Sequence, residues 1–358
     1  MAGKRYPFLK LSGNPLERGR LYGRTFRAEI DVSIANYTGM FRDFSGVSWE
    51  DAGRRSMEFL PFIREYSPKI VEEMEGIAEG SKRDFRDILT LNSRSEIVLD
   101  TQVDGCTAFG ATPAVTSDGK TYLCQNWDWI RRQEKSLAII QIEQPPEPTV
   151  LMIAEAGIIS GKGINSSGIG VGFNALTTGY GKPGVPVHVL LRGMLDAPGL
   201  ADAVQAVAVS PRASSANFIV GSSEGEVIDI EASPDDFWVF YAEKGWISHT
   251  NHFTATFLPG LAKDKGKVLL PDSFQRLGRI NTLLAAHEGK MDFEHCKTFL
   301  SDHISYPDSI CRHEDPGDPE GKQLASVYST IMDLTDGVIW FSSSNPCLGG
   351  FAPFGPIR

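Results

Sequence analysis

The short segment Asp104-Gly105-Cys106-Thr107 places a cysteine directly after a glycine. A thiolate is the best side-chain nucleophile near neutral pH, provided that a neighbour lowers its pKa or takes its proton. Gly105 has no Cβ to obstruct attack on its own carbonyl, and glycine tolerates strained dihedral angles. The Cys106 sulfur can therefore attack the Gly105 carbonyl, take over the acyl group and let water release a new N-terminus.

Such a cut would give Cys106 two chemical roles. The freed α-amine has a reference pKa of about 7.7–8.0, low enough for a general base beside the sulfur. From these four residues alone, a cysteine that packs at the start of a strand is the more common explanation. The interpretation as a nucleophile therefore depends on the rest of the chain.

The chain before Cys106 is helical in pattern from residue 14 to about 100. Asn14 and Pro15 form an N-cap and first-turn pair. Further helices are predicted at about 49–66, from Pro68 to Ser81, and at about 84–98. An apolar stripe at four-residue spacing predicts that one helix follows Pro15: Tyr22, Phe26, Ile30 and Ile34.

From Cys106 onward the pattern changes to short β-rich runs between Gly, Asn and Asp turns. Two helical insertions interrupt them, at about 186–209 and 272–302. A hairpin that turns at Asp336-Gly337 closes the chain. Strands, helices and strands again predict an α+β domain of two antiparallel sheets with packed helices.

Eight segments together resemble one known family, the isopenicillin N acyltransferases (acyl-CoA:6-aminopenicillanate acyltransferases) among the N-terminal-nucleophile hydrolases. The likeness follows the family's order over nearly the whole chain and is weak at the distal ends and in 314–345. The segments are GIAEGSKRDFRDILTLNSRSE (76–96), DGCTAFG (104–110), CQNWDW (124–129), EAGIISGKGINSSGIGVGFNAL (155–176), GVPVHVLLR (184–192), HTNHF (249–253), LPDSFQR (270–276) and YPDSICR (306–312).

The resemblance implies a fold and a maturation step. The fold is a four-layer αββα sandwich of two antiparallel sheets with a helical N-terminal segment. Maturation is self-cleavage between Gly105 and Cys106. It would give a helical subunit, 1–105, and a β-rich catalytic subunit, 106–358, that stay together as a heterodimer.

The resemblance also implies roles for four residues. Cys106 in DGCT matches the nucleophile, and Asp128 in QNWD matches the aspartate that positions the new amino group. Asn251 in HTNH matches the side-chain donor of the oxyanion hole, and Arg312 in SICR matches the arginine beside the nucleophile. A cation near sulfur favours thiolate, and an amide N–H stabilises a tetrahedral oxyanion.

Two more residues match family segments with a looser role. Asn174 in GFNA and Ser309 in PDSICR are expected to support the substrate or the structure of the site. Trp127 and Trp129 flank Asp128 in the sequence, so on a strand both should pack on the face opposite to Asp128.

The activity implied is that of an enzyme acting on amide (N-acyl) bonds of small molecules through a thioester on Cys106. An alternative is acyl-CoA-dependent transfer to a β-lactam or another amine, with acyl-CoA as co-substrate and no resident cofactor. A further alternative is a non-catalytic binding protein that keeps the fold. The ending Pro356-Ile357-Arg358 is not of the peroxisomal type seen in fungal members, which argues against penicillin as the product.

Composition limits the partners. The 358 residues include 45 acidic and 35 basic side chains, a net charge of −10, without a Lys/Arg run. Phosphate backbones repel such a surface, so no nucleic-acid partner is expected. No stretch approaches the roughly 20 apolar residues that span a bilayer. With no signal-peptide pattern either, we expect a cytoplasmic protein without a membrane partner.

Two patterns that can indicate ligands have simpler explanations. The glycines between 161 and 172 match neither a dinucleotide nor a Walker motif, so a β-hairpin is predicted. His249 and His252 lie three apart, which on a strand turns them to opposite faces. The five cysteines contain no Cys-x-x-Cys pair. From the cysteines we therefore expect reduced thiols, and neither the histidines nor the cysteines predict a metal site.

Overall fold

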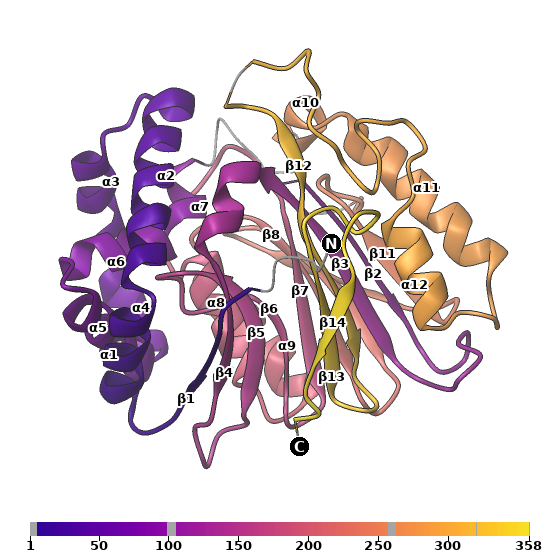
Figure 1. The fold of residues 1–358 in the computed structure, drawn as a ribbon, viewed down its shortest axis with the longest axis horizontal. Helices are drawn as coiled ribbons and strands as arrows, with labels where there is room; N and C mark the ends of the chain where they lie inside the picture. Colours follow the sequence, from indigo (N-terminus) through magenta and orange to yellow (C-terminus); the bar gives the residue numbers. More distant parts are fainter. Residues whose placement is uncertain (1–5, 99–104, 257–262, 320, 358) are drawn as a thin grey trace.

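Two β-sheets stack face to face at the centre of the molecule (Figure 1). The computed structural model describes residues 6–98, 105–256, 263–319 and 321–357. In order across the eight-stranded sheet, the strands are β1 (Phe8–Leu11), β4 (Leu137–Ile142), β5 (Val150–Glu155), β6 (Lys162–Asn165), β7 (Ile169–Ala175), β8 (Ala216–Ser222), β9 (Val227–Ala232) and β10 (Phe237–Tyr241). In the six-stranded sheet they are β11 (Trp246–His249), β2 (Gly105–Ala111), β3 (Tyr122–Ile130), β12 (Leu324–Asp333), β13 (Val338–Ser343) and β14 (Phe351–Phe354).

Helices cover both outer faces of this pair of sheets. Helices α8 (Val187–Leu195) and α9 (Leu200–Ala208) pack on the eight-stranded sheet. Helices α11 (Asp272–Ala286) and α12 (Phe293–Leu300) pack on the six-stranded one, and the short α10 (Gly266–Leu269) precedes them. Strands β2 and β3 contact β7 and β8 across the interface between the sheets. The predicted α+β fold of four αββα layers is therefore confirmed.

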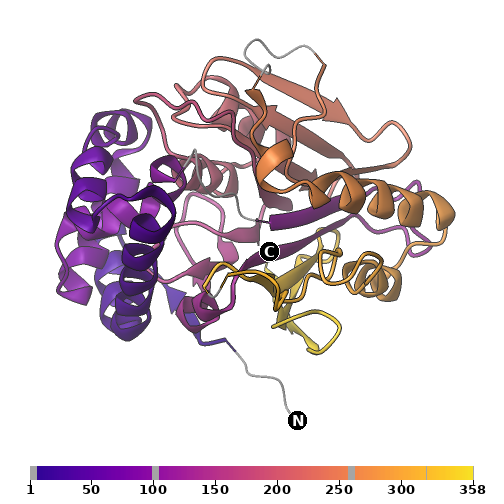
Figure 2. The same cartoon turned by 90° about the horizontal axis from the view of Figure 1, so that it is seen from above.

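The N-terminal helices form a block at one side of the sheets, seen in indigo and violet in Figure 2. Asn14 caps the first helix as predicted, with a capping box that includes Glu17. None of the described helices is both long and apolar enough to cross a membrane. The block contains α1 (Pro15–Thr25), α2 (Arg27–Ser45), α3 (Trp49–Ser56), α4 (Leu60–Tyr66), α5 (Pro68–Ser81), α6 (Phe85–Asn92) and α7 (Arg94–Ile97).

The prediction of one helix through the apolar stripe is wrong at Phe26. This residue has φ −105° and ψ 29°, outside the helical range, and it separates α1 from α2. Tyr22, Phe26 and Ile30 are nevertheless buried as a continuous stripe. The change of direction lets α1 lie along α5 while α2 contacts the 3-10 helix η1 (Arg131–Ser136). Each of the predicted stretches 49–66 and 84–98 likewise contains two short helices.

Strand β1 corrects two expectations about the sheets. It pairs in parallel with β4, from Phe8 opposite Ile139 to Leu11 opposite Ile142, so the eight-stranded sheet is not purely antiparallel. The N-terminal segment is also not purely helical, because it supplies this edge strand. The four-residue β1 and β14 were missed because such short runs carry no readable alternation. By contrast, β6 and β7 form the predicted hairpin, with Gly168 at φ 83° in its turn.

Glycines let α1 and α5 pack backbone to backbone. A Cβ at Gly19 would overlap the carbonyl oxygen of Glu73, and a Cβ at Gly76 would overlap that of Leu16. The Gly76 Cβ would also lie 2.9 Å from the Cα of Gly19. Because both obstacles are main-chain atoms, neither can move aside without shifting a whole helix.

We expect Gly76→Ala to lower the free energy of unfolding by about 1–3 kcal/mol, since the added methyl group forces α1 and α5 apart. Gly278→Ala on α11 is the matched control, because nothing lies within 4 Å of the Cβ it adds. That control should raise the free energy by up to about 1 kcal/mol through higher helix propensity. Urea denaturation measures both, and equal effects from the two variants would contradict the close packing.

Candidate active site

Cys106 is the second residue of β2, an interior strand that lies between β11 and β3. The residue is completely buried. Its backbone N–H donates to Asn251 Oδ1 at 2.9 Å, and its carbonyl oxygen accepts from Arg276 Nη1 at 2.6 Å. The backbone on both sides of the Cys106 Cα is therefore fixed by side chains as well as by the sheet.

The two faces of β2 carry different chemistry at this point. Cys106 pairs with Trp127, so their side chains share the face toward the eight-stranded sheet. Trp127 stacks with Trp129 there and contacts Tyr328, which confirms the predicted burial of both indoles opposite Asp128. Asp128 pairs with Gly105 instead. Its carboxyl group faces the layer of helices.

Gly105 and Asp128 approach each other so closely that only glycine leaves enough room. A Cβ at position 105 would lie 2.9 Å from Asp128 Cβ and 3.1 Å from Asp128 Oδ2. In the sequence, Gly105 was interpreted as leaving its own carbonyl open to attack. The structure adds that the Asp128 side chain leaves no room for a Cβ at this position. The Asp128 carboxyl group thus lies directly against the residue that precedes Cys106.

The Asp128 carboxyl group has one occupied and one unoccupied oxygen. Oδ1 accepts a hydrogen bond of 2.7 Å from Ser326 Oγ. Oδ2 is buried and has no hydrogen-bond partner in the described part of the chain, although Arg312 Nε lies 3.8 Å away. Burial raises the pKa of Asp128 above its usual value, and the charges of Arg276 and Arg312 only partly oppose this. The carboxyl group can therefore accept one more donor.

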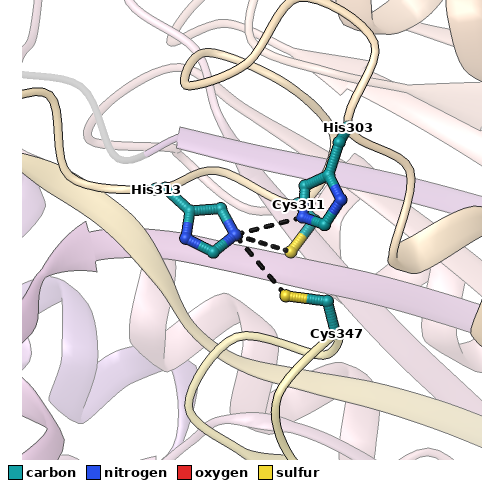
Figure 3. Close-up of side chains that lie close together, drawn as sticks. All are labelled: His303, Cys311, His313 and Cys347. Atoms are coloured by element: carbon teal, nitrogen blue, oxygen red, sulfur yellow. Dashed lines mark hydrogen bonds between the residues drawn. The ribbon is translucent and has the colours of Figure 1, made fainter.

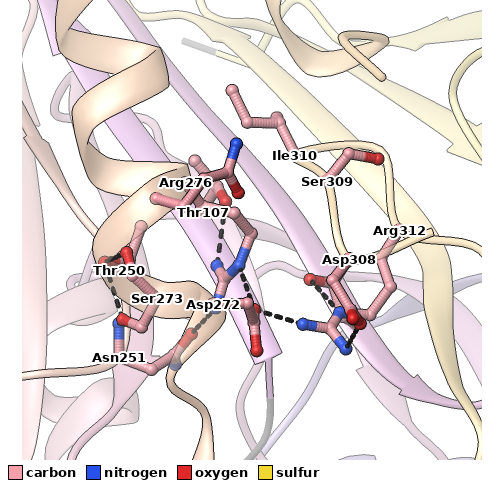
Figure 4. A network of polar contacts seen from close by, with 12 residues as sticks. Thr107, Thr250, Asn251, Asp272, Ser273, Arg276, Asp308, Ser309, Ile310 and Arg312 are labelled. Atoms are coloured by element: carbon pink, nitrogen blue, oxygen red, sulfur yellow. Dashed lines mark hydrogen bonds and ion pairs between the residues drawn. The ribbon is translucent and has the colours of Figure 1, made fainter. Parts of the chain in front are cut away.

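Arg276, on α11, joins most of the polar groups at the site (Figure 4). Besides the Cys106 carbonyl, Nη1 reaches Thr107 Oγ1 at 3.0 Å, and Nη2 donates to Asn251 Oδ1 at 2.9 Å. Its Nε donates to Asp272 Oδ2 at 2.7 Å. Arg276 is fully buried, so its charge depends on this carboxylate for compensation.

Asp272 extends the network to Arg312, since its Oδ2 also accepts from Arg312 Nη2. Burial opposes ionisation of Asp272, but the charges of Arg276 and Arg312 outweigh burial and hold its pKa below the usual value. Arg312 Nη1 in turn donates to Asp308 Oδ1 at 2.7 Å. Arg312 thus lies among three aspartates, and the guanidinium in direct contact with Cys106 is that of Arg276.

The roles of Arg276 and Asp272 were missed from the sequence, although both lie in the segment LPDSFQR. Their Asp-x-x-x-Arg spacing on a helix was a readable signal, because side chains four residues apart meet on one face. Spacing alone does not say which helix face lies against the nucleophile. That information comes only from the packing of α11 on β2 and β11.

Asn251 follows β11 and presents its oxygen, not its N–H groups, to Cys106. Oδ1 accepts from both the Cys106 N–H and Arg276, and two converging donors fix the orientation of the amide. Nδ2 donates to the carbonyl of Ala175 at 3.2 Å. The expected oxyanion donor role therefore stays a prediction, and in this structure Asn251 holds the Cys106 nitrogen.

Glu231 on β9 fixes the segment that carries Asn251. Its Oε1 accepts from His249 Nε2 at 2.7 Å and from the backbone N–H of Thr254 at 2.6 Å. Its Oε2 accepts from the Ala255 N–H at 3.0 Å. His252 turns elsewhere, with Nδ1 2.7 Å from Ser273 Oγ. The ring nitrogens of the two histidines therefore have different partners.

Asn174 and Ser309 lie at the margins of this network. Asn174, on β7, donates to the carbonyl of His249 at 3.4 Å and accepts from Asn217 at the same distance. Ser309 donates to the carbonyl of Cys311 at 2.6 Å within its own loop. Both are fully buried. Their contacts place them as supports of the segments that carry Asn251 and Arg312.

A buried lysine of the eight-stranded sheet was also missed from the sequence, and it lies toward the face of β2 that carries the Cys106 side chain. Lys162, on β6, has its Nζ 5.0 Å from the ring centroid of Trp127, 5.4 Å from that of Phe173 and 5.7 Å from that of Tyr328. Because Trp127 pairs with Cys106, this cation lies in the space between the sheets that the cysteine faces. Such aromatic contacts stabilise a desolvated ammonium group.

We expect His249 to make stability fall as pH rises. Burial lowers its pKa, but Asp229 and Glu231 outweigh burial and raise it to about 9. Both ring nitrogens face acceptors, Glu231 and the Thr250 carbonyl, as in an imidazolium. The stabilisation is complete below the unfolded pKa of about 6.5 and is lost as pH rises through 9.

His249→Gln should therefore flatten the dependence of the unfolding free energy on pH between about 6.5 and 9.5, by roughly 1–3 kcal/mol. Urea denaturation across this range measures the effect. Parallel profiles for the wild type and His249→Gln would mean that His249 is neutral.

Comparison with known proteins places this site in a family. The family described as acyl-coenzyme A:6-aminopenicillanic acid acyl-transferase matches residues 115–347, a range that contains Asp128, Asn251 and Arg312 and begins after Cys106. The acyl-coenzyme A:6-aminopenicillanic-acid-acyltransferase 40 kDa form of Emericella nidulans is 32% identical over 320 residues, which cover 88% of this chain and 87% of that protein.

Two solved structures are similar to this chain at lower sequence identity. A variant of the conjugated bile acid hydrolase from Clostridium perfringens is 16% identical with a TM-score of 0.48, over 69% of this chain and 96% of that one. Penicillin V acylase from Agrobacterium tumefaciens is 14% identical with a TM-score of 0.44, over 66% and 83%. On the evidence of the matched range and the relative from Emericella nidulans, the chain belongs to the acyl-coenzyme A:6-aminopenicillanic acid acyl-transferase family of enzymes.

Proposed function

We propose that this chain cuts itself between Gly105 and Cys106 and then uses Cys106 as an N-terminal nucleophile on N-acyl bonds of small molecules. The observation that carries the proposal is the set of contacts around Cys106. Its nitrogen is bound by Asn251, its carbonyl by Arg276, and the residue before it lies against the incompletely bonded Asp128. These contacts surround the peptide bond that has to break.

The cut proceeds in two steps. The Cys106 sulfur attacks the Gly105 carbonyl carbon, the C–N bond breaks, and the thiol proton ends on the departing nitrogen, which leaves a thioester. Water then hydrolyses the thioester to a Gly105 carboxylic acid and restores the thiol. Asn251 Oδ1 already accepts the N–H of the departing nitrogen, so it can hold that nitrogen as it becomes an amine.

Asp128 is the natural partner of the new amine. Its Oδ2 lacks a donor among the described residues, and burial raises its pKa. An ammonium group nearby would donate to Oδ2 and would stabilise the charged form of the Asp128 carboxyl group against burial. The other new end, the Gly105 carboxylate, would form against the same carboxyl group. The Gly105 and Asp128 carboxylates would repel each other, and this repulsion would drive the end of the small fragment away from Cys106.

That displacement matters because the uncut chain buries Cys106 completely. A substrate reaches the sulfur only after the chain end has moved. The sulfur would then attack an acyl group while the Cys106 amine takes the proton, and the acyl group would be held as a thioester. Lys162 in the space between the sheets favours substrates that carry a carboxylate, such as N-acyl amino compounds.

The two fragments have enough contacts to stay associated. Strand β1 is hydrogen-bonded into the eight-stranded sheet through β4. Glu73 on α5 is buried and paired with Arg192 on α8 at 2.9 Å, and Arg94 is paired with Glu155 at 3.0 Å. Burial opposes ionisation of Glu73, but Arg192 and Arg18 outweigh burial and keep its pKa low. We infer a heterodimer of 1–105 and 106–358.

Cys106→Ala tests the nucleophile. The wild type should run on a denaturing gel as fragments of 105 and 253 residues (358 − 105), and the variant as one chain of 39.2 kDa. Hydrolysis of an N-acyl amino acid should fall by more than about a thousandfold, as expected for loss of a nucleophile. Intact-protein mass spectrometry and product analysis measure the two effects.

The matched control is Cys124→Ala, which removes a buried thiol from the neighbouring strand β3 and leaves the site intact. It should be cut and active. A Cys106→Ala chain that is cut at the same bond, or that turns over at the wild-type rate, would show that another group does this chemistry.

A second candidate is acyl-CoA-dependent transfer to an amine, favoured by the name of the relative from Emericella nidulans. Both reactions share the thioester and differ in whether water or an amine resolves it. With the cut protein, an N-acyl amino acid and an added acceptor amine, we expect the free carboxylic acid of the acyl group as the main product. A new amide that exceeds the free acid, measured by mass spectrometry, would establish transfer instead.

A further inference from the structure

Two histidines and two cysteines meet beside the loop that carries Arg312, with Cys311 buried and His303 exposed (Figure 3). His303, Cys311 and His313 lie in the loop between α12 and β12, and Cys347 lies between β13 and β14. Their potential ligand atoms, one per residue, all lie within 4.8 Å of one another. The whole chain has only seven histidines and five cysteines, so a third of them converge here.

Three separations among these ligand atoms are close to the edges of a tetrahedron around a transition metal. Zn–N bonds of about 2.05 Å and Zn–S bonds of about 2.3 Å give edges of about 3.3 Å for N···N and about 3.6 Å for N···S. In the structure, His303 Nε2 lies 3.1 Å from His313 Nε2. The sulfurs of Cys311 and Cys347 lie 3.6 and 3.5 Å from the same His313 nitrogen.

Hydrogen bonding does not account for this convergence. His313 Nε2 has either one proton to give or one lone pair to accept with, so it can make only one good hydrogen bond in the ring plane. Three polar atoms nevertheless surround it, namely one imidazole nitrogen and two sulfurs. A cation in the centre of the four groups would use every one of them.

The surroundings hold the ligands in place. The ring of Tyr306 packs against both imidazoles, with centroids 6.1 Å from that of His303 and 5.1 Å from that of His313. Asn345 Nδ2 donates to the Arg312 carbonyl at 2.6 Å and lies 4.0 Å from the Cys311 sulfur. This asparagine already connects the two segments that supply the ligands.

We propose that His303, Cys311, His313 and Cys347 form a tetrahedral site for Zn²⁺ or a similar thiophilic divalent cation. Four protein ligands leave no open position for water, which indicates a structural role. The metal would tie the loop 303–313 to the turn at Cys347. Arg312 directly follows Cys311, so the site would fix the loop that positions this arginine near Asp128.

The sequence predicted no metal because the ligands do not follow a paired Cys-x-x-Cys spacing. Only Cys311 and His313 are close in sequence, and Cys347 lies on a different connection of the sheet. Pairing of β12 with β13 brings the two connections together. The inference does not depend on the proposed cleavage, because it rests on side chains outside that network.

The experiment uses the full chain, expressed with added zinc, purified under reducing conditions and dialysed against a dilute chelator. Elemental analysis should find about one zinc per chain. Cobalt replacing zinc should show the visible bands of tetrahedral cobalt and thiolate-to-cobalt charge-transfer bands. In Cys347→Ser and in His303→Ala the metal content should fall at least about tenfold, because removing one ligand of four weakens binding strongly.

His295→Ala and Cys124→Ser are the matched controls and should keep the full metal content. Both test positions, Cys347 and His303, are at the surface, and circular dichroism checks that the variants fold. The proposal is overturned if the chelator strips the wild type as readily as the variants, or if the cobalt bands persist without Cys347. It is also overturned if wild type purified without reductant is free of metal and contains a Cys311–Cys347 disulfide, seen as a loss of two hydrogens in its unreduced mass.

Discussion

The geometry around Cys106 depends on one buried guanidinium group. Arg276 donates to the carbonyl of Cys106, to Thr107, to Asn251 and to Asp272, so four of its five N–H groups are used in fixed directions. A lysine could not replace it, because an ammonium group lacks the planar fork that spans these acceptors. The strand, the loop after β11 and helix α11 are joined at this single side chain.

The charge of Arg276 also organises the groups farther away. Asp272 compensates it and passes the interaction on to Arg312, which in turn contacts Asp308 and lies near Asp128. Three carboxyl groups thus face two guanidinium groups, and the balance is negative when all are ionised. Asp128 lies at the end of this chain of charges, and its pKa is raised because burial outweighs the opposing charges of Arg276 and Arg312. A new cation at this point would complete the set.

The layers of the fold could be predicted from the sequence because hydrophobic periodicity reports directly on them. Helices before Cys106, strands after it and two helical insertions all follow from patterns of burial. The break at Phe26 was not predictable in this way, since the apolar stripe continues across it and tertiary packing sets the angle. Strands β1 and β14 were too short to show a period.

In the candidate site, too, some residues could be predicted from local sequence and others depend on tertiary packing. Cys106, Asp128, Asn251 and Arg312 were found because they lie in segments that resemble a family, and the structure brings them to one region. Arg276 lies in such a segment without an assigned role, because its importance comes from the face that α11 turns toward β2. Lys162 and the cluster of His303, Cys311, His313 and Cys347 were missed for the same reason, because tertiary packing brings their partners together. Contacts between distant segments have no signature in local spacing.

Strand β1 has a consequence for the lifetime of the molecule under the proposed cut. It would belong to the small fragment, yet it forms the edge of a sheet whose other strands would belong to the large one. An uncut chain would refold as one polypeptide, whereas a denatured cut molecule would have to reunite two, with a recovery that falls on dilution. The cut form would therefore persist through slow unfolding rather than through reversible equilibrium, and its working life would be set by a rate.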